Sequence, residues 1–236
     1  MTPPFPLGQA ITNYDDSGSL GSRFRKKRVQ LLLRAIDCVA SRHGQVRIID
    51  VGGMKNYWNI IPLAYLSERH VTITIVNLAG PKTPQDDEVF KFIAADACDL
   101  SMFEDQSFDI AHSNSVIEHV GGWPRMVSFA NECTRVAEHY FIQTPSIWFP
   151  IEPHAMFPFF HWLPWPTRVW LLMHLNIGKW RQVKLLGAAV DTIDSVQLLS
   201  RSMFGGLFPE ATISTERFLG FSKSYVATSP NLTSER

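Results

Sequence analysis

An acidic residue and two glycines end the first of several short apolar runs. The run is IIDVGG, residues 48–53, and the three residues are Asp50, Gly52 and Gly53. Because glycine has no Cβ, the chain can turn tightly there and a ligand can approach the backbone closely. Ligands of open α/β sheets bind outside the carboxyl ends of the strands, which is where these residues would lie. The motif indicates a cofactor site, with an ordinary strand-to-helix turn as the alternative.

Small and polar residues also end the next three apolar runs. They are Asn77 after VTITIV, Asp96 and Ala97 after FKFIAA, and Ser113 and Asn114 in FDIAHSNS. The amide of Asn77 can both donate to and accept from hydroxyl groups, which suits a ribose. These strand ends predict a nucleotide site assembled across one edge of a sheet.

Two histidines and one carboxylate lie in a segment rich in aromatic residues and prolines, TPSIWFPIEPHAMFPFFHWLPWP, residues 144–166. Histidine titrates near neutral pH and is suited to take a proton from an oxygen nucleophile. We expect His154 to be a catalytic base or to contact the acceptor, with Glu152 orienting its imidazole; a structural hydrogen-bonding role is the alternative. His161 is a further catalytic candidate. Two histidines seven residues apart match no common metal-ligand spacing, so no metal site is expected.

The elements that must position these side chains are short apolar strands alternating with helices. Such near-continuous apolar strands are typical of a parallel sheet covered on both faces. The strands are expected at VRIIDV (46–51), VTITIV (71–76), FKFIAA (90–95), FDIAHS (108–113) and YFIQT (140–144). Helices are expected over 22–43, 58–68, 124–138, 167–175 and 194–203. The closing TISTERFL and KSYVATS predict a hairpin.

One domain over residues 1–236 can accommodate the whole chain, because 236 residues with 45% hydrophobic content suffice for a full core. Within it we expect a loose arm at 1–21, an N-terminal helix at 22–43 and a lid or substrate insertion at 145–190. Prolines in the insertion forbid one continuous spanning helix and favour a stiff lid. Its aromatic side chains would exclude water from an apolar acceptor.

Composition and charge limit the kinds of partner and location that we expect for the chain. A formal net charge of zero provides no basic field to gather nucleic acid. The apolar runs fall far short of the roughly 20 residues of a bilayer-spanning helix. PTRVWLLMHLNIGKW mixes apolar and basic residues, which leaves peripheral membrane contact open. Three cysteines without paired spacing, and no signal-peptide pattern, indicate a cytoplasmic location. The sequence carries no sign of an oligomeric state.

Taken together, the motifs resemble those of the class I S-adenosylmethionine-dependent methyltransferases, in particular the bacterial UbiE and type 11 group. The motifs are IIDVGG, VNL, AADACDL, SFDIAHSNSVIEHV, YFIQTPS and GFSKSYVAT, between about Arg23 and Thr228. The resemblance implies a Rossmann-like α/β fold, with a seven-stranded, mostly parallel sheet and helices on both faces. It also implies a last strand that runs antiparallel between its neighbours, and S-adenosyl-L-methionine as the cofactor.

The resemblance also assigns residues to parts of the cofactor. It places Asp50, Gly52 and Gly53 at the methionine end, Asn77 at the ribose, Asp96 and Ala97 at the adenine, and Ser113 and Asn114 under the sulfonium. His119 matches a histidine of the fourth motif and is expected to pack near the cofactor. Two residues depart from the usual pattern, since Met54 replaces the last glycine and Asn77 replaces an acid.

We therefore expect a methyltransferase that acts by in-line transfer on a small, apolar or aromatic acceptor. A non-catalytic cofactor-binding or scaffold protein on the same fold is the alternative, which the departures at Met54 and Asn77 permit. An NAD-dependent oxidoreductase would need a G-x-G-x-x-G turn after the first strand, and VGGMKNYW does not provide one.

Overall fold

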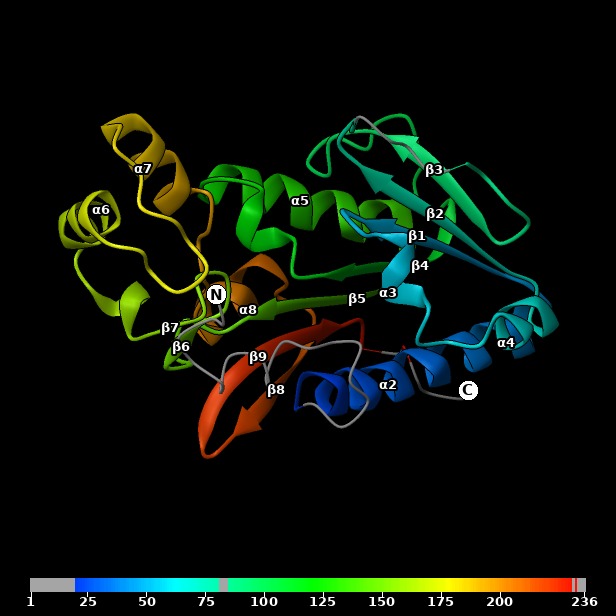
Figure 1. Ribbon diagram of the computed structural model, residues 1–236. Coiled ribbons are helices and arrows are strands. Elements are labelled where there is room, and N and C mark those ends of the chain that lie inside the picture. The colour runs from blue at the N-terminus through cyan, green and yellow to red at the C-terminus, as the bar shows by residue number, and fades with distance from the viewer. Residues whose placement is uncertain (1–19, 81–84, 231, 233–236) are drawn as a thin grey trace.

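In the computed structural model the chain is described over residues 20–80, 85–230 and 232, with side chains from residue 28 onward (Figure 1). Most of the expected N-terminal arm, residues 1–21, lies outside the described residues. The expected N-terminal helix is present as α2 (Leu20–His43). It ends where Gly44 takes a φ of 71° and its N–H donates to the carbonyl of Ala40.

A single sheet in the described part of the chain holds seven strands, in the order β3-β2-β1-β4-β5-β9-β8. Strands β1 to β5 pair in parallel, whereas β9 runs antiparallel between β5 and β8. The strands are β1 (Val46–Val51), β2 (Val71–Asn77), β3 (Phe90–Ala94), β4 (Phe108–Asn114), β5 (Ala137–Pro145), β8 (Thr212–Phe218) and β9 (Phe221–Thr228). The predicted fold class, the five predicted apolar strands and the terminal hairpin are confirmed.

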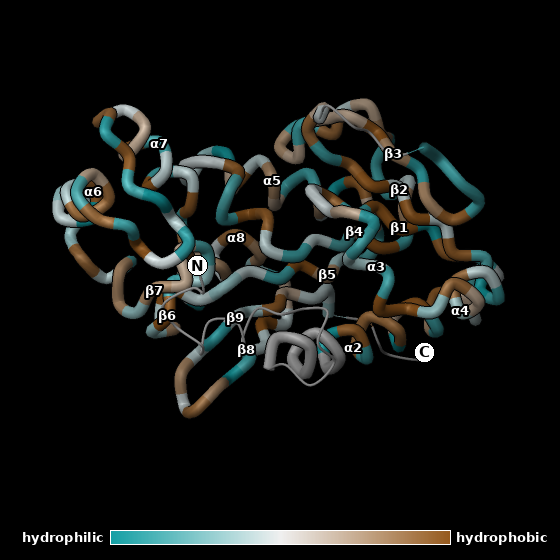
Figure 2. The backbone as a smooth tube through the Cα atoms, in the orientation of Figure 1, coloured by the Kyte–Doolittle hydropathy of each residue, from teal (hydrophilic) through white to brown (hydrophobic). Residues whose placement is uncertain are grey.

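Helices cover both faces of the sheet. Because consecutive strand residues point to opposite sides, neighbouring residues of β1 pack in different cores. Ile48 of β1 packs in the core that contains Leu32 of α2, together with α3 (Lys55–Trp58) and α4 (Leu63–Glu68). Ile49 packs in the opposite core, which contains Phe129 of α5 (Trp123–Val136) and residues of α8 (Arg201–Leu207). Figure 1 shows α5 and α2 on opposite sides of the strands. In Figure 2 strands β1 and β2 are mostly hydrophobic and many of the connecting loops hydrophilic.

Two helix predictions were wrong in extent. The helix expected over 58–68 is interrupted before Pro62, since a residue that precedes proline is disfavoured in the α conformation. The expected helix over 194–203 does not form as one continuous helix, because one helix ends at Asp194 and the next begins at Arg201. Between them Leu199 is extended, and its carbonyl accepts from the backbone N–H of Ile147 at 3.0 Å. Long-range pairing therefore overrides the local helical pattern.

Residues 146–199, between β5 and α8, are called the insertion here. They form a hairpin of β6 (Ile151–Glu152) and β7 (Phe157–Pro158), the 3₁₀ turn η2 (Phe160–Trp162), and the helices α6 (Trp165–His174) and α7 (Leu186–Asp194). The insertion has a core of its own, built from Ala155, Phe160, Val169, Leu172, Ile177, Ala189 and Ile193. Figure 1 places α6 and α7 together at one end of the molecule, away from β2 and β3. None of the helices among the described residues is long and apolar enough to cross a membrane.

Candidate functional site

Two adjoining cavities lie along the carboxyl ends of the parallel strands. The edge cavity, about 250 Å³, is lined by Gly52, Asn77, Leu78, Ala95, Asp96, Ala97, Ser115, Val116, His119, Val120 and Arg125. The inner cavity, about 320 Å³, is lined by Arg28, Asn114, Ser115, His119, Gln143, Pro145, Ser146, Phe149, Ile151, Pro153, His154, Met156, Lys223 and Ser224. Ser115 and His119 line both, so the two cavities meet at these residues.

The glycine turn after β1 is fixed by its neighbours. Gly52 has a φ of 73°, and a Cβ there would lie 2.4 Å from a methyl carbon of Val116. A Cβ on Gly53 would overlap the carboxylate of Asp50. The amide of Asn77 donates to the carbonyl of Gly53 at 3.1 Å and accepts from the N–H of Leu78 at 2.8 Å. Both glycines are therefore required for packing, and Asn77 ties β2 to the turn.

Asp50 is buried beneath this turn and points into the protein. One carboxylate oxygen accepts from the indole N–H of Trp58 at 2.8 Å, and the other from Nδ1 of His112 at 2.7 Å. The imidazole of His112 stacks on Phe141 with ring centroids 5.9 Å apart. The structure thus shows Asp50 as a brace between β1, α3 and β4. Its partners lie 8 and 62 residues away in the sequence.

Asp96 stands at the edge cavity with its charge already paired. Both of its oxygens accept from Nη2 of Arg125, at 2.8 and 2.7 Å, and one also accepts from the N–H of Cys98. The Arg125 guanidinium, and next the Cys98 N–H, hold the pKa of Asp96 below its usual value. Ala97, Val116 and Val120 line the same cavity with apolar groups. Arg125 was not among the residues identified from the sequence.

Ser113 and Asn114 at the end of β4 point in different directions. The hydroxyl of Ser113 is buried and donates to the carbonyl of Val51 at 2.8 Å, which links β4 to β1. Asn114 lines the inner cavity, and its Oδ1 accepts from Nη1 of Arg28 at 2.5 Å. Of the two residues assigned to the sulfonium region, only Asn114 presents its side chain to the inner cavity.

Glu152 and His154 meet beside the inner cavity, which His154 lines and Glu152 does not. Nδ1–H of His154 donates to Glu152 at 2.9 Å, and the other oxygen of Glu152 accepts from the backbone N–H groups of His154 and Ala155. Glu152 is only 2% exposed. Because its oxygens are held by this turn, the carboxylate fixes the orientation of the His154 ring and leaves Nε2 as the atom with a lone pair.

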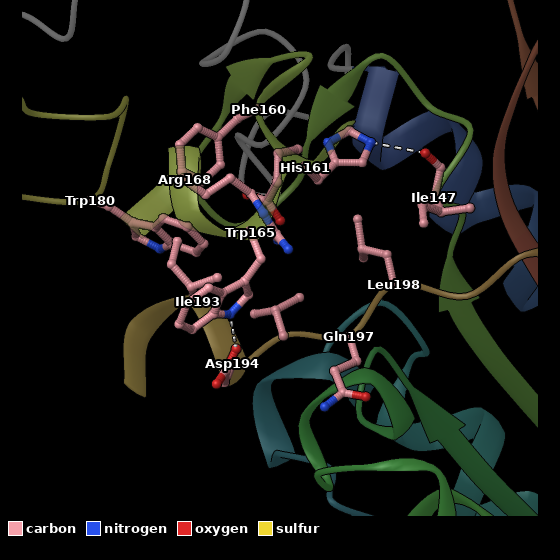
Figure 3. Close-up of a pocket in the computed structure, with 12 residues that line it drawn as sticks. Ile147, Phe160, His161, Trp165, Arg168, Trp180, Ile193, Asp194, Gln197 and Leu198 are labelled. Carbon is pink, nitrogen blue, oxygen red and sulfur yellow. Dashed lines mark hydrogen bonds between the residues drawn. The ribbon is translucent and has the colours of Figure 1, made fainter. Parts of the chain in front are cut away.

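His161 lies in a different place, on the insertion cavity of about 290 Å³ (Figure 3). Its Nε2 lies 2.9 Å from the carbonyl of Ile147, and Figure 3 shows the ring turned toward that carbonyl. Burial lowers the pKa of His161. Trp165 and Asp194, on the other side of the cavity, are joined by an indole hydrogen bond of 2.7 Å. The structure therefore joins Glu152 to His154 by a hydrogen bond, but Glu152 lines the insertion cavity together with His161. Of the three predicted catalytic residues, only His154 lines the inner cavity.

Two residues next to β4 form part of the site and were not assigned chemistry from the sequence. Glu118 is 1% exposed, and one of its oxygens accepts from the hydroxyl of Thr144 at 3.0 Å. Burial raises the pKa of Glu118 to about 7. His119 donates from Nδ1 to the carbonyl of Ser195 at 2.9 Å and meets His154 edge-on, with ring centroids 4.6 Å apart. The letters VIEHV directly after a strand end were the available signal, but their proximity to His154 depends on the fold.

The described part of the inner cavity also carries positive charge. Arg28 forms an ion pair with Glu216 at 3.1 Å, and Lys223 lines the same cavity. Burial, and next the nearby Arg28, lowers the pKa of Lys223 to about 8. The apolar part of the wall comes from Phe149, Ile151 and Met156, with two prolines. This cavity can hold a molecule that has an apolar body and polar or anionic groups.

Comparison with known proteins relates this arrangement to one fold. Residues 63–139 match the family model Methyltransf_11, described as a methyltransferase domain. No curated protein sequence matches the chain significantly. Among solved structures, trans-methyltransferase CalH in complex with SAH is 10% identical, with a TM-score of 0.52 over 91% of this chain and 60% of that chain. A possible exported protein from Bordetella parapertussis is 11% identical, with a TM-score of 0.50 over 93% and 70%.

A more distant structural match is the 1,6-didemethyltoxoflavin-N1-methyltransferase of Burkholderia thailandensis, with bound 1,6-didemethyltoxoflavin and S-adenosylhomocysteine. It is 15% identical, with a TM-score of 0.46 over 82% of this chain and 75% of that chain. At these identities the likeness shows the fold alone. The chain spans 60% of the length of CalH.

Proposed function

We propose that the chain is a class I S-adenosylmethionine-dependent methyltransferase and methylates a small molecule held in the inner cavity, since residues 63–139 match a methyltransferase-domain model. The observation that carries the proposal is the junction of the two cavities at Ser115 and His119, at the carboxyl ends of the strands. One cavity has the residues for a nucleoside, and the other has a histidine with an oriented ring. A methyl group at the junction would be accessible from the inner cavity.

The edge cavity fits an adenosine. Asp96 keeps lone pairs that Arg125 does not use, so it can accept from the exocyclic amine of adenine while its charge stays neutralised. Ala97 and Val116 provide apolar contact for the base. Asn77, whose Oδ1 has a second lone pair, faces the same cavity and is assigned to the ribose. Asp50 acts indirectly, by holding the glycine turn from beneath.

When bound, S-adenosyl-L-methionine supplies a methyl carbon on a positively charged sulfur. The chain must then align an acceptor atom with that carbon and keep water out, since alignment alone supplies much of the rate enhancement. Phe149 and Met156 would contact an apolar or aromatic acceptor body, while Arg28 and Lys223 would contact a polar or anionic group. The insertion would act as the lid that closes this cavity.

His154 is the residue proposed to prepare the acceptor. With Nδ1–H bonded to Glu152, Nε2 can take a proton from an acceptor hydroxyl as the oxygen bonds to the methyl carbon and the carbon–sulfur bond breaks. Glu152 stabilises the imidazolium that forms. His161, in contrast, is proposed to stabilise the insertion internally, through its contact with the Ile147 carbonyl.

A transfer assay tests this proposal. The purified protein is incubated with methyl-labelled S-adenosylmethionine and a small-molecule extract, and mass spectrometry follows labelled products. We expect a labelled product with the wild type and at least a tenfold loss in His154→Ala, consistent with the usual contribution of an acid–base group. His174→Ala, an exposed histidine on α6, is the matched control and should retain activity. Cofactor binding without any labelled product would instead support the non-catalytic alternative.

A further inference from the structure

Three side chains with metal-binding atoms converge where the edge and inner cavities meet. They are Glu118, His119 and His154, and one ligand atom from each lies within 4.8 Å of the other two. Two of these residues follow β4, and the third belongs to the insertion. Because they are brought together only by the fold, their spacing in the sequence does not reveal them.

The hydrogen bonds of the two histidines leave the right atoms for a cation. Nδ1 of His154 bonds to the Glu152 carboxylate, and Nδ1 of His119 to the Ser195 carbonyl, both at 2.9 Å. Both partners are pure acceptors, so each Nδ1 carries the hydrogen and each Nε2 keeps its lone pair. Histidines that bind metals characteristically donate their other N–H to a carboxylate or a backbone carbonyl.

Glu118 provides a carboxylate oxygen that lacks a partner. One oxygen accepts from Thr144, whereas Oε1 is buried and has no hydrogen-bond donor among the described residues. Buried polar atoms are normally paired, so an acceptor left without a donor inside a cluster of ligands indicates a missing positive group. A metal ion or a proton would satisfy it.

The charge at the cluster points to an ion. Glu118 and Glu152 are both buried, at 1% and 2% exposure, so their carboxylates need positive charge close by. Glu152 is paired with His154 and is also near Arg168 of α6. Within the described chain, Glu118 forms no ion pair with lysine or arginine. A divalent ion bound to Glu118 and to the Glu152-linked His154 would balance two carboxylates.

We propose that Glu118, His119 and His154 bind one divalent transition-metal ion, of the kind served by a two-histidine, one-carboxylate set. Three ligand atoms about 2.1 Å from one tetrahedral ion lie about 3.4 Å apart, so atoms separated by up to 4.8 Å must approach by up to about 1.4 Å. Three protein ligands leave a coordination position open toward the inner cavity.

The ion would deepen the proposed function at the same site, and only this step rests on that function. An acceptor hydroxyl bound at the open position loses its proton to solvent more readily, which leaves an alkoxide or phenolate to attack the methyl carbon. With the ion bound, His154 would serve as a ligand, and it would act as the base proposed above only in the metal-free protein. Ion binding itself rests only on the three side chains.

Metal content and spectroscopy test the proposal directly. Tag-free protein is stripped with chelator, dialysed against Zn²⁺ or Co²⁺ and freed of excess ion, and the bound metal is measured by mass spectrometry. We expect about one ion per chain, visible absorption bands for the Co²⁺ form, and a higher melting temperature with metal. Glu118→Gln and His119→Ala should each lose most of the bound ion, and His174→Ala should bind as the wild type does.

Folding of each variant is checked by circular dichroism, and Glu118→Gln preserves the size of the buried side chain. Metal content no higher than background, or equal metal in wild type and Glu118→Gln, would overturn the proposal and leave a proton as the partner of Oε1. Calorimetry with S-adenosylmethionine on the stripped protein keeps the two proposals separate. A protein that binds the cofactor but takes up no metal in the loading experiment sinks only the metal site, whereas a protein that takes up metal but binds no cofactor sinks only the proposed function.

Discussion

At the scale of single residues, the strand ends were easier to predict than what each side chain does. Asp50, Asn77 and Asp96 were identified because each lies at or just beyond the end of an apolar run, and the structure places all three at the carboxyl ends of β1, β2 and β3. Their hydrogen-bond partners were not predicted, since Arg125 reaches Asp96 across 29 residues. Local pattern locates such residues, whereas burial and long-range contacts decide whether they face a ligand or brace the fold.

The glycine turn gives a first prediction. Gly52→Ala forces a side chain into a φ of 73° and against Val116, which should cost about 1–3 kcal/mol of stability and weaken cofactor binding. Gly187→Ala in α7 is the control, because a Cβ there meets open space and should leave stability unchanged or slightly higher. Chemical denaturation of both variants measures the difference, and equal stabilities would refute the role of the turn.

The assignment of Asp96 to the adenine gives a second prediction. Asp96→Ala should weaken S-adenosylmethionine binding by about 10- to 100-fold, since it removes an acceptor for the adenine amine and leaves Arg125 uncompensated. Asp105→Ala, which removes a comparable carboxylate–arginine pair with Arg135, should bind normally. Titration calorimetry compares the two, and unchanged affinity in Asp96→Ala would remove this residue from the site.

Glu118 gives a pH-dependent prediction for the metal-free protein. Burial raises its pKa from 4.5 to about 7, so the folded state binds the proton more tightly than the unfolded state. This contribution to stability is present at low pH and is lost as the pH rises through about 7. Relative to wild type, Glu118→Gln should therefore gain stability between about pH 5 and about pH 8. A constant difference across that range, in melting experiments with chelator, would contradict the shift.

At the scale of elements, the strands were predicted well and the helices less well. Strong apolar runs define β1, β2, β4 and β5, because both faces of these strands are buried, whereas β3 is only partly buried. The helix expected over 194–203 was wrong because Leu199 pairs with Ser146 of the insertion, a contact that periodicity does not contain. The position of His161 depends in the same way on how the insertion folds.

The insertion gives an element-scale prediction. Leu172→Ala in α6 removes a fully buried side chain from its core and should cost about 2–5 kcal/mol of local stability. Turnover should then fall while cofactor affinity stays the same, since the edge cavity is formed by the strand ends and the loops after them. Leu175→Ala, at a position 52% exposed, is the control. A parallel loss of cofactor affinity in Leu172→Ala would argue against a separate lid.

At the scale of the whole molecule, the sheet order could be expected from the resemblance, and the structure has it. The antiparallel pairing of β9 with β5 joins two strands that are far apart in the sequence. The meeting of Glu118 and His119 with His154 was not predictable, because it depends on how the insertion returns over the edge of the sheet. The residues proposed to bind the cofactor could thus be named from sequence motifs, whereas the cluster of Glu118, His119 and His154 needed the three-dimensional arrangement.

The most direct test of the central claim is calorimetric titration of the purified chain with S-adenosylmethionine and with S-adenosylhomocysteine. We expect saturable binding of both ligands, at about one molecule per chain, with competition between them for the edge cavity. Absence of binding by a folded protein, or binding that Asp96→Ala and Gly52→Ala leave unchanged, would contradict it.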